Sequence, residues 1–141
     1  SSSNYSFLRF HHIIWKWATK NHGLTNTELS TLLYVFPLVS FTMADFFEAQ
    51  KDMESTSPNT FFNLKKKGFI SKWSSTGRTT HYVLSNKGIS LVNRLHRMYM
   101  LEEEIPMSPR RNVIVRKSKK EDSGLVNLFK KFNEKIKKDA K

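Results

Sequence analysis

The sequence of 141 residues contains no cysteine, which excludes disulfide bridges, thiolate metal sites and thiol redox chemistry. It also lacks an apolar run of the roughly 18–20 residues that a membrane-spanning helix needs. No charged segment followed by an apolar one opens the chain, so we expect no secretory signal and no membrane partner. Glycine-rich phosphate loops, nucleophile motifs and paired carboxylates are missing too. These absences favour a binding protein and not an enzyme.

The five histidines do not form a metal-binding pattern. His11 and His12 are adjacent in sequence and therefore point to different faces of a helix. The other three histidines have no carboxylate at the spacing that metal ligands require. We therefore expect no metal ion and no other cofactor.

Acidic residues are scarce, because 12 Asp and Glu stand against 24 Lys and Arg, for a net charge of +12. The surplus lies in two stretches, residues 51–88 with a net charge of +5 and residues 105–141 with +8, whereas residues 1–50 are neutral. Such a surplus favours a polyanionic partner, since binding releases counterions from a phosphate backbone. The alternative is that the charge only keeps the protein soluble.

Apolar residues recur at helical spacing over most of the first hundred residues. They predict helices at 6–21, 25–36, about 42–50, 55–67 and 86–103. Two helix starts carry the residues of a capping box, namely Thr25 with Glu28 and Thr42 with Asp45. In helix 42–50, the side chains predicted to face inward are Met43, Phe46 and Phe47. In helix 55–67 they are Phe61 and Leu64.

The apolar spacing then changes from helical to strand-like. Residues 69–73 and 79–84 are predicted strands that a polar turn at 74–78 joins into a β-hairpin. The order of helix, short turn, helix and hairpin is typical of the winged helix-turn-helix. In that arrangement the major groove of B-DNA admits the recognition helix, 55–67, and the hairpin, 69–84, reaches the backbone or the minor groove. We predict a mainly α fold with a small β-hairpin wing, flanked by N- and C-terminal helices.

Three segments resemble the multiple antibiotic resistance regulator (MarR) family of transcriptional regulators. They are Leu-Thr-Asn-Thr-Glu-Leu at 24–29, Leu-Lys-Lys-Lys-Gly-Phe-Ile-Ser-Lys at 64–72, and Val-Leu-Ser-Asn-Lys-Gly at 83–88. The resemblance covers about residues 6–104. It implies a dimer formed by the terminal helices, here 6–21 and 123–139, whose two recognition helices read a pseudo-palindrome. The sequence departs from the family in its wing tip, which has a single arginine, and in a long linker.

Candidate DNA contacts follow from the chemistry of each side chain. Polar residues on helix 55–67 suit base edges, because asparagine can pair with adenine through two hydrogen bonds. Lysine and arginine suit phosphates. The predicted base contacts are Thr56, Asn59, Thr60 and Asn63. The predicted backbone contacts are Ser55, Lys65, Lys66, Lys67, Lys72, Arg78, Arg110 and Arg111. The alternative for both sets is a polar surface that only solvent touches.

We divide the chain into a winged-helix DNA-binding domain at 6–104, a basic linker at 105–122 and a C-terminal amphipathic basic helix at 123–141. A short strand at 112–115 would fit within the linker. The last helix carries an apolar stripe that needs a partner in this chain, in another subunit or in another protein; its members are Leu125, Leu128, Phe129, Phe132 and Ile136.

The first hypothesis is a sequence-specific double-stranded DNA-binding protein, a homodimeric, MarR-like transcriptional regulator that is cytoplasmic and associated with the nucleoid. The alternative is a winged-helix interaction or structural module that docks on a larger nucleoprotein assembly through helix 123–139. The sequence does not identify a small-molecule effector.

Overall fold

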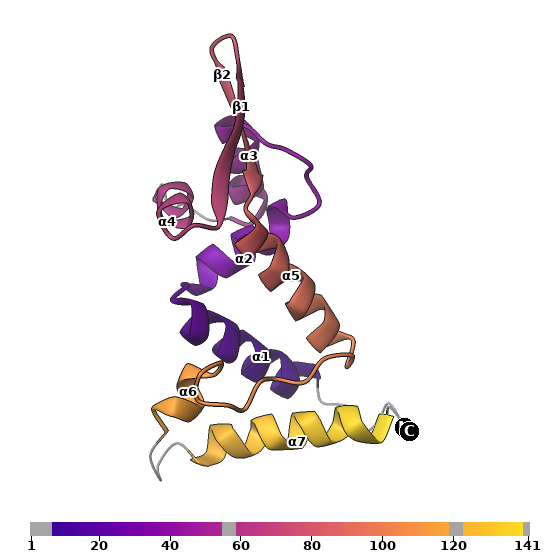
Figure 1. The fold of residues 1–141 in the computed structure, drawn as a ribbon. Coiled ribbons are helices and arrows are strands. Elements are labelled where there is room, and N and C mark those ends of the chain that lie inside the picture. Colours follow the sequence, from indigo (N-terminus) through magenta and orange to yellow (C-terminus); the bar gives the residue numbers. More distant parts are fainter. Residues whose placement is uncertain (1–6, 55–58, 119–122, 140–141) are drawn as a thin grey trace. The chain divides into compact units, whose positions relative to one another are not determined.

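The structure, a computed structural model, describes residues 7–54, 59–118 and 123–139. It is mainly helical and contains a two-stranded antiparallel sheet, as the sequence predicts (Figure 1). The chain divides into two compact units. Residues 25–93 form one, called here the winged-helix unit, and residues 1–24 with 94–141 form the other, called here the helical unit.

The winged-helix unit begins with three helices, α2 (Asn26–Val35), α3 (Met43–Asp52) and α4 (Thr60–Lys66). Both predicted capping boxes are confirmed. The Thr25 hydroxyl accepts the Glu28 amide at 3.1 Å, and the Glu28 carboxylate accepts the Thr25 amide at 2.8 Å. Thr42 and Asp45 make the same two bonds at the start of α3. Each box satisfies two amides that a helix start otherwise leaves without a partner.

An aromatic core joins α3, α4 and the hairpin. The ring centroids of Phe46 and Phe61 are 5.2 Å apart, and those of Phe61 and Tyr82 are 4.9 Å apart, both pairs edge to face. Phe41, directly before α3, exchanges two backbone hydrogen bonds with Tyr82 on the hairpin, of 2.9 and 2.7 Å. These contacts fix α4 relative to the hairpin. Phe47 was predicted to face this core as well, but it is 41% exposed, so that prediction is wrong.

The hairpin is longer than predicted. Strand β1 (Ile70–Thr76) pairs with β2 (Thr79–Leu84) from Ile70 opposite Leu84 to Thr76 opposite Thr79. The turn is therefore only Gly77-Arg78, and the serines assigned to the turn belong to β1. Gly77 adopts a φ of +62°, which glycine tolerates without steric cost. The longer strands extend the wing away from its base.

Helix α5 (Asn86–Tyr99) begins in the winged-helix unit and ends in the helical unit. The Ser85 hydroxyl accepts the Gly88 amide at 3.2 Å and caps the start of the helix. The helix ends at Tyr99, four residues earlier than predicted. Gly88 lies against the base of the hairpin, because a Cβ placed on it would be 2.9 Å from the carbonyl oxygen of Phe69.

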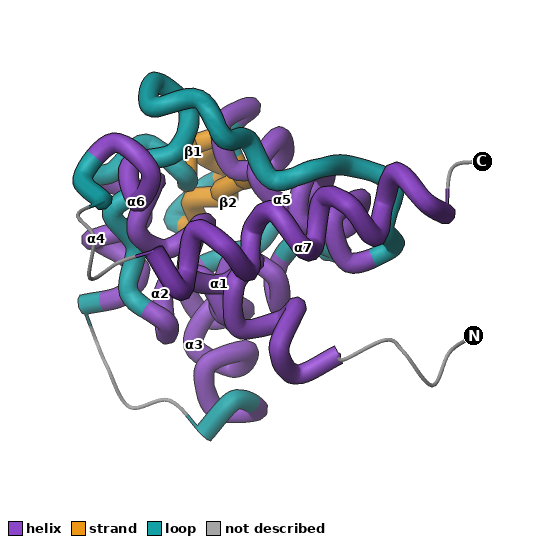
Figure 2. The backbone as a smooth tube through the Cα atoms, turned by 90° about the horizontal axis from the view of Figure 1, so that it is seen from below, coloured by secondary structure: helices purple, strands orange, loops and turns teal. Residues whose placement is uncertain are grey.

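The helical unit contains α1 (Phe7–His22), α6 (Val113–Arg116) and α7 (Ser123–Asp139). Helix α1 packs against α6 and α7 (Figure 2). The strand suggested at 112–115 is wrong, because a short helix occupies this place. Asn112 explains the difference: its buried side-chain oxygen caps the amides of Ile114 and Val115, which favours a helical turn.

Most of the apolar stripe of α7 is covered within the chain, while Leu125 and Leu128 are half-buried. Phe129 and Phe132 are fully buried, and the Phe132 ring meets Phe10 of α1 edge to face with centroids 5.2 Å apart. On the same helix Asn133 makes two hydrogen bonds to the backbone of Ile105, of 2.8 and 2.9 Å. Of the three partners considered for this stripe, the structure provides the first, another part of the same chain.

Candidate nucleic-acid interface

The inner face of α4 is defined by three buried residues. Thr60, Phe61 and Leu64 are 2%, 1% and 0% exposed. The prediction that Thr60 faces outward is wrong for a geometric reason: it lies four residues before Leu64, and residues at this spacing share one face of a helix. A buried threonine cannot present its hydroxyl to a base edge. Of the other predicted contacts, Ser55 and Thr56 lie outside the described residues.

The outer face of α4 is exposed and mixes amide, aromatic and basic side chains. Its members are Asn59, Phe62, Asn63, Lys65 and Lys66, all of them exposed. Phe62 is 55% exposed, and sequence reasoning did not assign it a role. A signal was nevertheless present, since two adjacent helical residues cannot both face the core, and Phe61 already does so.

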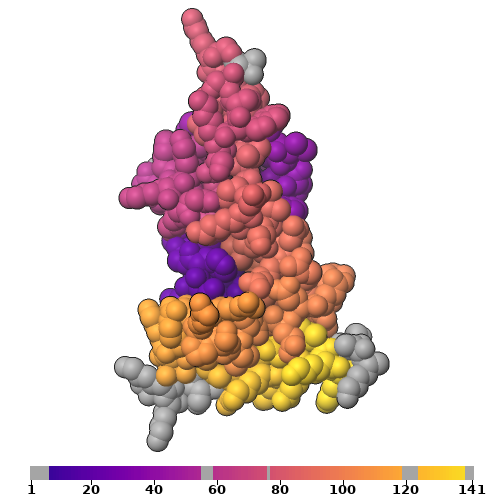
Figure 3. Space-filling model, in the orientation of Figure 1, coloured from indigo at the N-terminus to yellow at the C-terminus, as the bar shows by residue number. Residues whose placement is uncertain are grey.

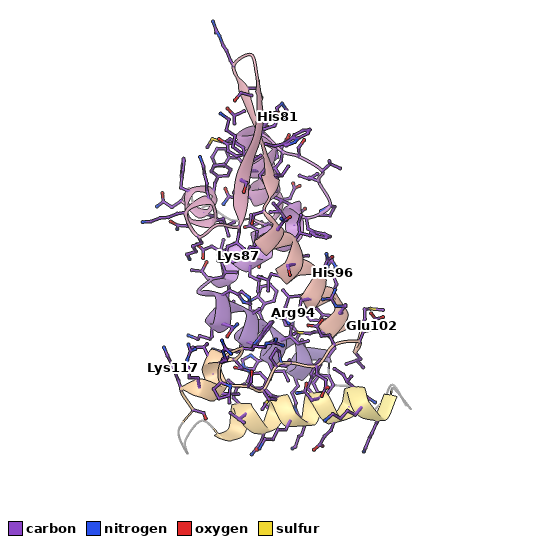
Figure 4. The ribbon with its side chains drawn as sticks, viewed as in Figure 1. His81, Lys87, Arg94, His96, Glu102 and Lys117 are labelled. Carbon is purple, nitrogen blue, oxygen red and sulfur yellow. The ribbon has the colours of Figure 1, made fainter. Side chains whose placement is uncertain are left out.

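The last turn of α4 is held by two lysines. The Lys67 ammonium lies 2.6 Å from the carboxylate of Glu28, whose side chain is 3% exposed. Lys67 therefore balances a buried charge on α2, and we remove it from the candidate phosphate contacts. Lys87 lies at the start of α5 (Figure 4). It donates to the carbonyl oxygen of Lys67 at 3.0 Å, and its ammonium lies over the Phe69 ring. Its positive charge suits a helix C-terminus.

The hairpin lies beside α4 (Figure 3). It carries two further basic residues. Lys72 on β1 and Arg78 in the turn are both exposed. Between Lys72 and Ser74 the register of the two strands shifts, which makes Trp73 the extra residue of a β-bulge. Trp73 is 63% exposed. Bulges commonly redirect a side chain, and here the redirected side chain is a large aromatic one on a basic wing.

Charge is segregated within the winged-helix unit. Residues 59–93, which contain α4, the hairpin and the start of α5, carry six basic residues and no acidic one. Residues 25–54, which contain α2 and α3, carry five acidic residues and one basic one. Positive charge is therefore concentrated on the elements predicted to contact DNA.

Arg110 and Arg111 belong to the helical unit and are both exposed in the turn before α6. The backbone oxygen of Arg111 accepts a hydrogen bond from the Trp17 indole at 3.2 Å, which anchors this turn to α1. Whether either arginine reaches DNA that α4 contacts stays a prediction.

The described residues include no group of three or more histidine, aspartate or glutamate side chains that could hold a metal ion. Among the helices of the described ranges, none has the length and apolar character needed to cross a membrane.

Comparison with solved structures finds the same fold in proteins with little sequence identity. A mutant of MepR from a multidrug-resistant S. aureus clinical isolate aligns with a TM-score of 0.51 and 17% identity, over 94% of this chain and 99% of that one. The multiple antibiotic-resistance repressor (MarR) of Listeria monocytogenes aligns with a TM-score of 0.50 and 20% identity, over 93% and 88% of the two chains. MepR, a transcription regulator of the Staphylococcus aureus efflux pump MepA, aligns with a TM-score of 0.48 and 20% identity, over 89% and 91%.

Protein-family models give no match to the chain, and curated protein sequences give no significant one. The likeness to the MepR mutant and to the Listeria protein shows the fold: the chain has the winged-helix fold of MarR-type proteins, as the three sequence segments predict.

Proposed function

We propose that this protein is a sequence-specific double-stranded DNA-binding protein that regulates transcription. Helix α4 enters the major groove with Asn59 and Asn63 directed at base edges, and Lys65 and Lys66 contact phosphates. The hairpin lies on the adjacent backbone or minor groove through Lys72 and Arg78. This division follows the general pattern in which base contacts specify a sequence and phosphate contacts position the protein.

The observation that carries the proposal is the exposed outer face of α4 beside the hairpin, in a segment with six basic residues and no acidic one. Two amides for base recognition lie next to cations for phosphate binding, on a helix whose opposite face is buried. The solved Listeria protein with the same fold is described as a repressor, which supports the regulatory part of the proposal.

The test is selection of binding sites from random double-stranded DNA, followed by affinity measurements at several stated salt concentrations. We expect a recurring sequence to be enriched and to bind at least about a thousandfold more tightly than random DNA. Equal affinity for selected and random DNA would show non-specific packaging, and no binding at low salt would exclude DNA as the partner.

The alternative, docking on a nucleoprotein assembly through helix 123–139, has less support than the sequence suggested. It was motivated by an apolar stripe in need of a partner, and Phe129, Phe132 and Ile136 of that stripe are buried within the helical unit. A docking role for α7 would have to use its lysine-rich face or expose the stripe.

We also propose that the protein is a homodimer through α1 and α7. Exposed apolar side chains support a contribution from α1, since Phe7 is 55% and Leu8 is 77% exposed. Because Phe129, Phe132 and Ile136 are covered within the chain, α7 would contribute a different face or the half-buried Leu125 and Leu128. Sedimentation or light scattering tests this: we expect twice the mass of the chain, and a monomer at all concentrations would refute it.

A further inference from the structure

Phe62 occupies the centre of the outer face of α4. It lies three residues after Asn59, three before Lys65 and four before Lys66, and side chains at these spacings are neighbours on a helix surface. Phe62 is thus surrounded by the groups proposed to contact DNA. Its own side chain is 55% exposed.

The ring of Phe62 has a defined place although it is exposed. Its centroid is 5.5 Å from that of the buried Phe61, and the two rings are nearly perpendicular at 88°. Phe61 in turn packs against Phe46 and Tyr82 of the core. An edge-to-face contact of this kind favours one orientation of the outer ring. Phe62 therefore presents an ordered apolar surface to water, at a position where a polar side chain would have a lower free energy of exposure.

Among the groups that base pairs expose in the major groove, the C5-methyl group of thymine is the apolar one. The other exposed groups are hydrogen-bond donors and acceptors, which a phenyl ring cannot satisfy. A ring at the centre of a helix that enters the major groove therefore matches thymine by its chemistry.

We propose that Phe62 is a specificity-determining residue that recognises thymine through its C5-methyl group. This inference rests on the proposed function and adds a base preference to it. Phe62 acts by apolar contact, so its contribution is independent of salt, in contrast to that of Lys65 and Lys66. The selected DNA sequence then contains at least one thymine that the protein recognises by its methyl group.

The experiment replaces each thymine of the selected sequence, one at a time, by deoxyuridine, which keeps every hydrogen-bonding group and lacks only the methyl. With the full-length protein we expect one position or more at which affinity falls about fourfold, the factor for one methyl-sized group that is no longer buried. The Phe62→Ala variant should bind thymine and deoxyuridine DNA equally at that position.

Phe47→Ala is the matched control. Phe47 lies on α3, is 41% exposed and also meets a buried ring edge to face, that of Phe46 at 6.4 Å and 82°. Its loss removes the same chemical group from outside the outer face of α4, so this variant should keep the full sensitivity to deoxyuridine. Because both rings are exposed, thermal unfolding of the two variants should resemble that of the wild type.

Two results would overturn the inference while leaving the proposed function intact. One is a selected sequence that tolerates deoxyuridine at every position, and the other is a Phe62→Ala variant as sensitive to deoxyuridine as the wild type. A Phe62→Ala variant with unchanged DNA binding is the plainest form of the second result, since Phe62 would then contribute nothing to DNA recognition. The proposed function itself fails separately, at the earlier step, if random DNA yields no enriched sequence.

Discussion

At the scale of single residues, the outer face of α4 separates affinity from specificity. Replacing Lys66 by alanine should weaken binding to all DNA sequences about equally and reduce the slope of log affinity against log salt by about 1, because one phosphate contact is lost. A salt titration of the wild type and the variant measures this slope. Lys138→Ala on α7 removes the same charge elsewhere and should leave the slope unchanged.

Asn63→Ala should have the opposite signature. The amide has no net charge, so the salt slope should stay the same. Discrimination between the selected sequence and its single-base variants should fall by roughly 1–3 kcal/mol at one position, the range for a bidentate base contact. Affinities for a panel of single-base variants measure this. A uniform loss across the panel would mean that Asn63 contacts the backbone.

Lys67 was predicted to contact phosphate, but in the structure it pairs with Glu28. Lys67→Ala leaves the buried Glu28 carboxylate without its counter-ion. We expect a loss of roughly 1–2 kcal/mol in the free energy of unfolding, less than for a fully buried pair because the Lys67 side chain is 35% exposed. Urea denaturation measures it. Adding Glu28→Gln should restore part of the loss, since the amide still accepts the Thr25 amide without carrying a charge; a double variant as unstable as Lys67→Ala would contradict this.

At the scale of elements, the junction between the wing and α5 is a packing constraint. Gly88 is the last residue of the segment 83–88 that resembles the MarR family. The structure leaves no room for a side chain at this position. Gly88→Ala brings a Cβ within 2.9 Å of the Phe69 carbonyl oxygen and 3.6 Å of the Leu84 Cβ. Because both neighbours belong to the base of the hairpin, we expect a loss of about 1–3 kcal/mol in stability.

Gly124→Ala is the matched control for this substitution. Gly124 lies in the first turn of α7, and a Cβ there would meet nothing within 4 Å. Alanine should therefore be neutral, or stabilising by up to about 1 kcal/mol through its higher helix propensity. Thermal or urea unfolding of both variants checks the pair. If Gly88→Ala were as stable as Gly124→Ala, the hairpin base would be less rigidly packed than described.

The elements that the sequence predicted well are those set by local interactions. The capping boxes of Thr25 and Thr42 involve residues three positions apart, so their helix starts could be read directly. The extent of the wing depends on pairing between distant residues, and a run of serine and threonine suits a strand as well as a turn. The short helix α6 depends on the buried, capping side chain of Asn112. In the sequence, Asn112 cannot be told apart from any other polar residue of a linker.

The candidate site shows the same division. Its basic character and the two asparagines followed from composition and helical spacing. The faces of α4 did not, although helical spacing from Leu64 and Phe61 places Thr60 on the inner face and Phe62 on the outer one. The pairing of Lys67 with Glu28 joins residues 39 positions apart and belongs to tertiary structure. Local patterns therefore identified the helix and much of its exposed face, and only packing showed that Lys67 is not available for DNA.

At the scale of the whole molecule, the question is how a covered α7 stripe is compatible with a dimer. Phe132→Ala removes a fully buried ring and its contact with Phe10, for an expected loss of roughly 3–5 kcal/mol. If α7 packs within its own chain, this loss should be the same at all protein concentrations. A loss that grows on dilution would mean that α7 packs on the partner chain, as in a domain swap.

Leu8→Asp tests the proposed dimer surface independently. Leu8 is 77% exposed, so a charge there should cost little in a single chain. In a dimer that buries α1, two aspartates would be desolvated without a cation, and dissociation should follow. Sedimentation of the variant should therefore give the mass of one chain. Its urea unfolding should stay close to that of the wild type at concentrations low enough to dissociate the dimer.

Binding of the variant to the selected sequence should weaken strongly, because two recognition helices held together in a dimer bind with a high effective concentration. A Leu8→Asp variant that keeps the wild-type mass would place the dimer interface elsewhere.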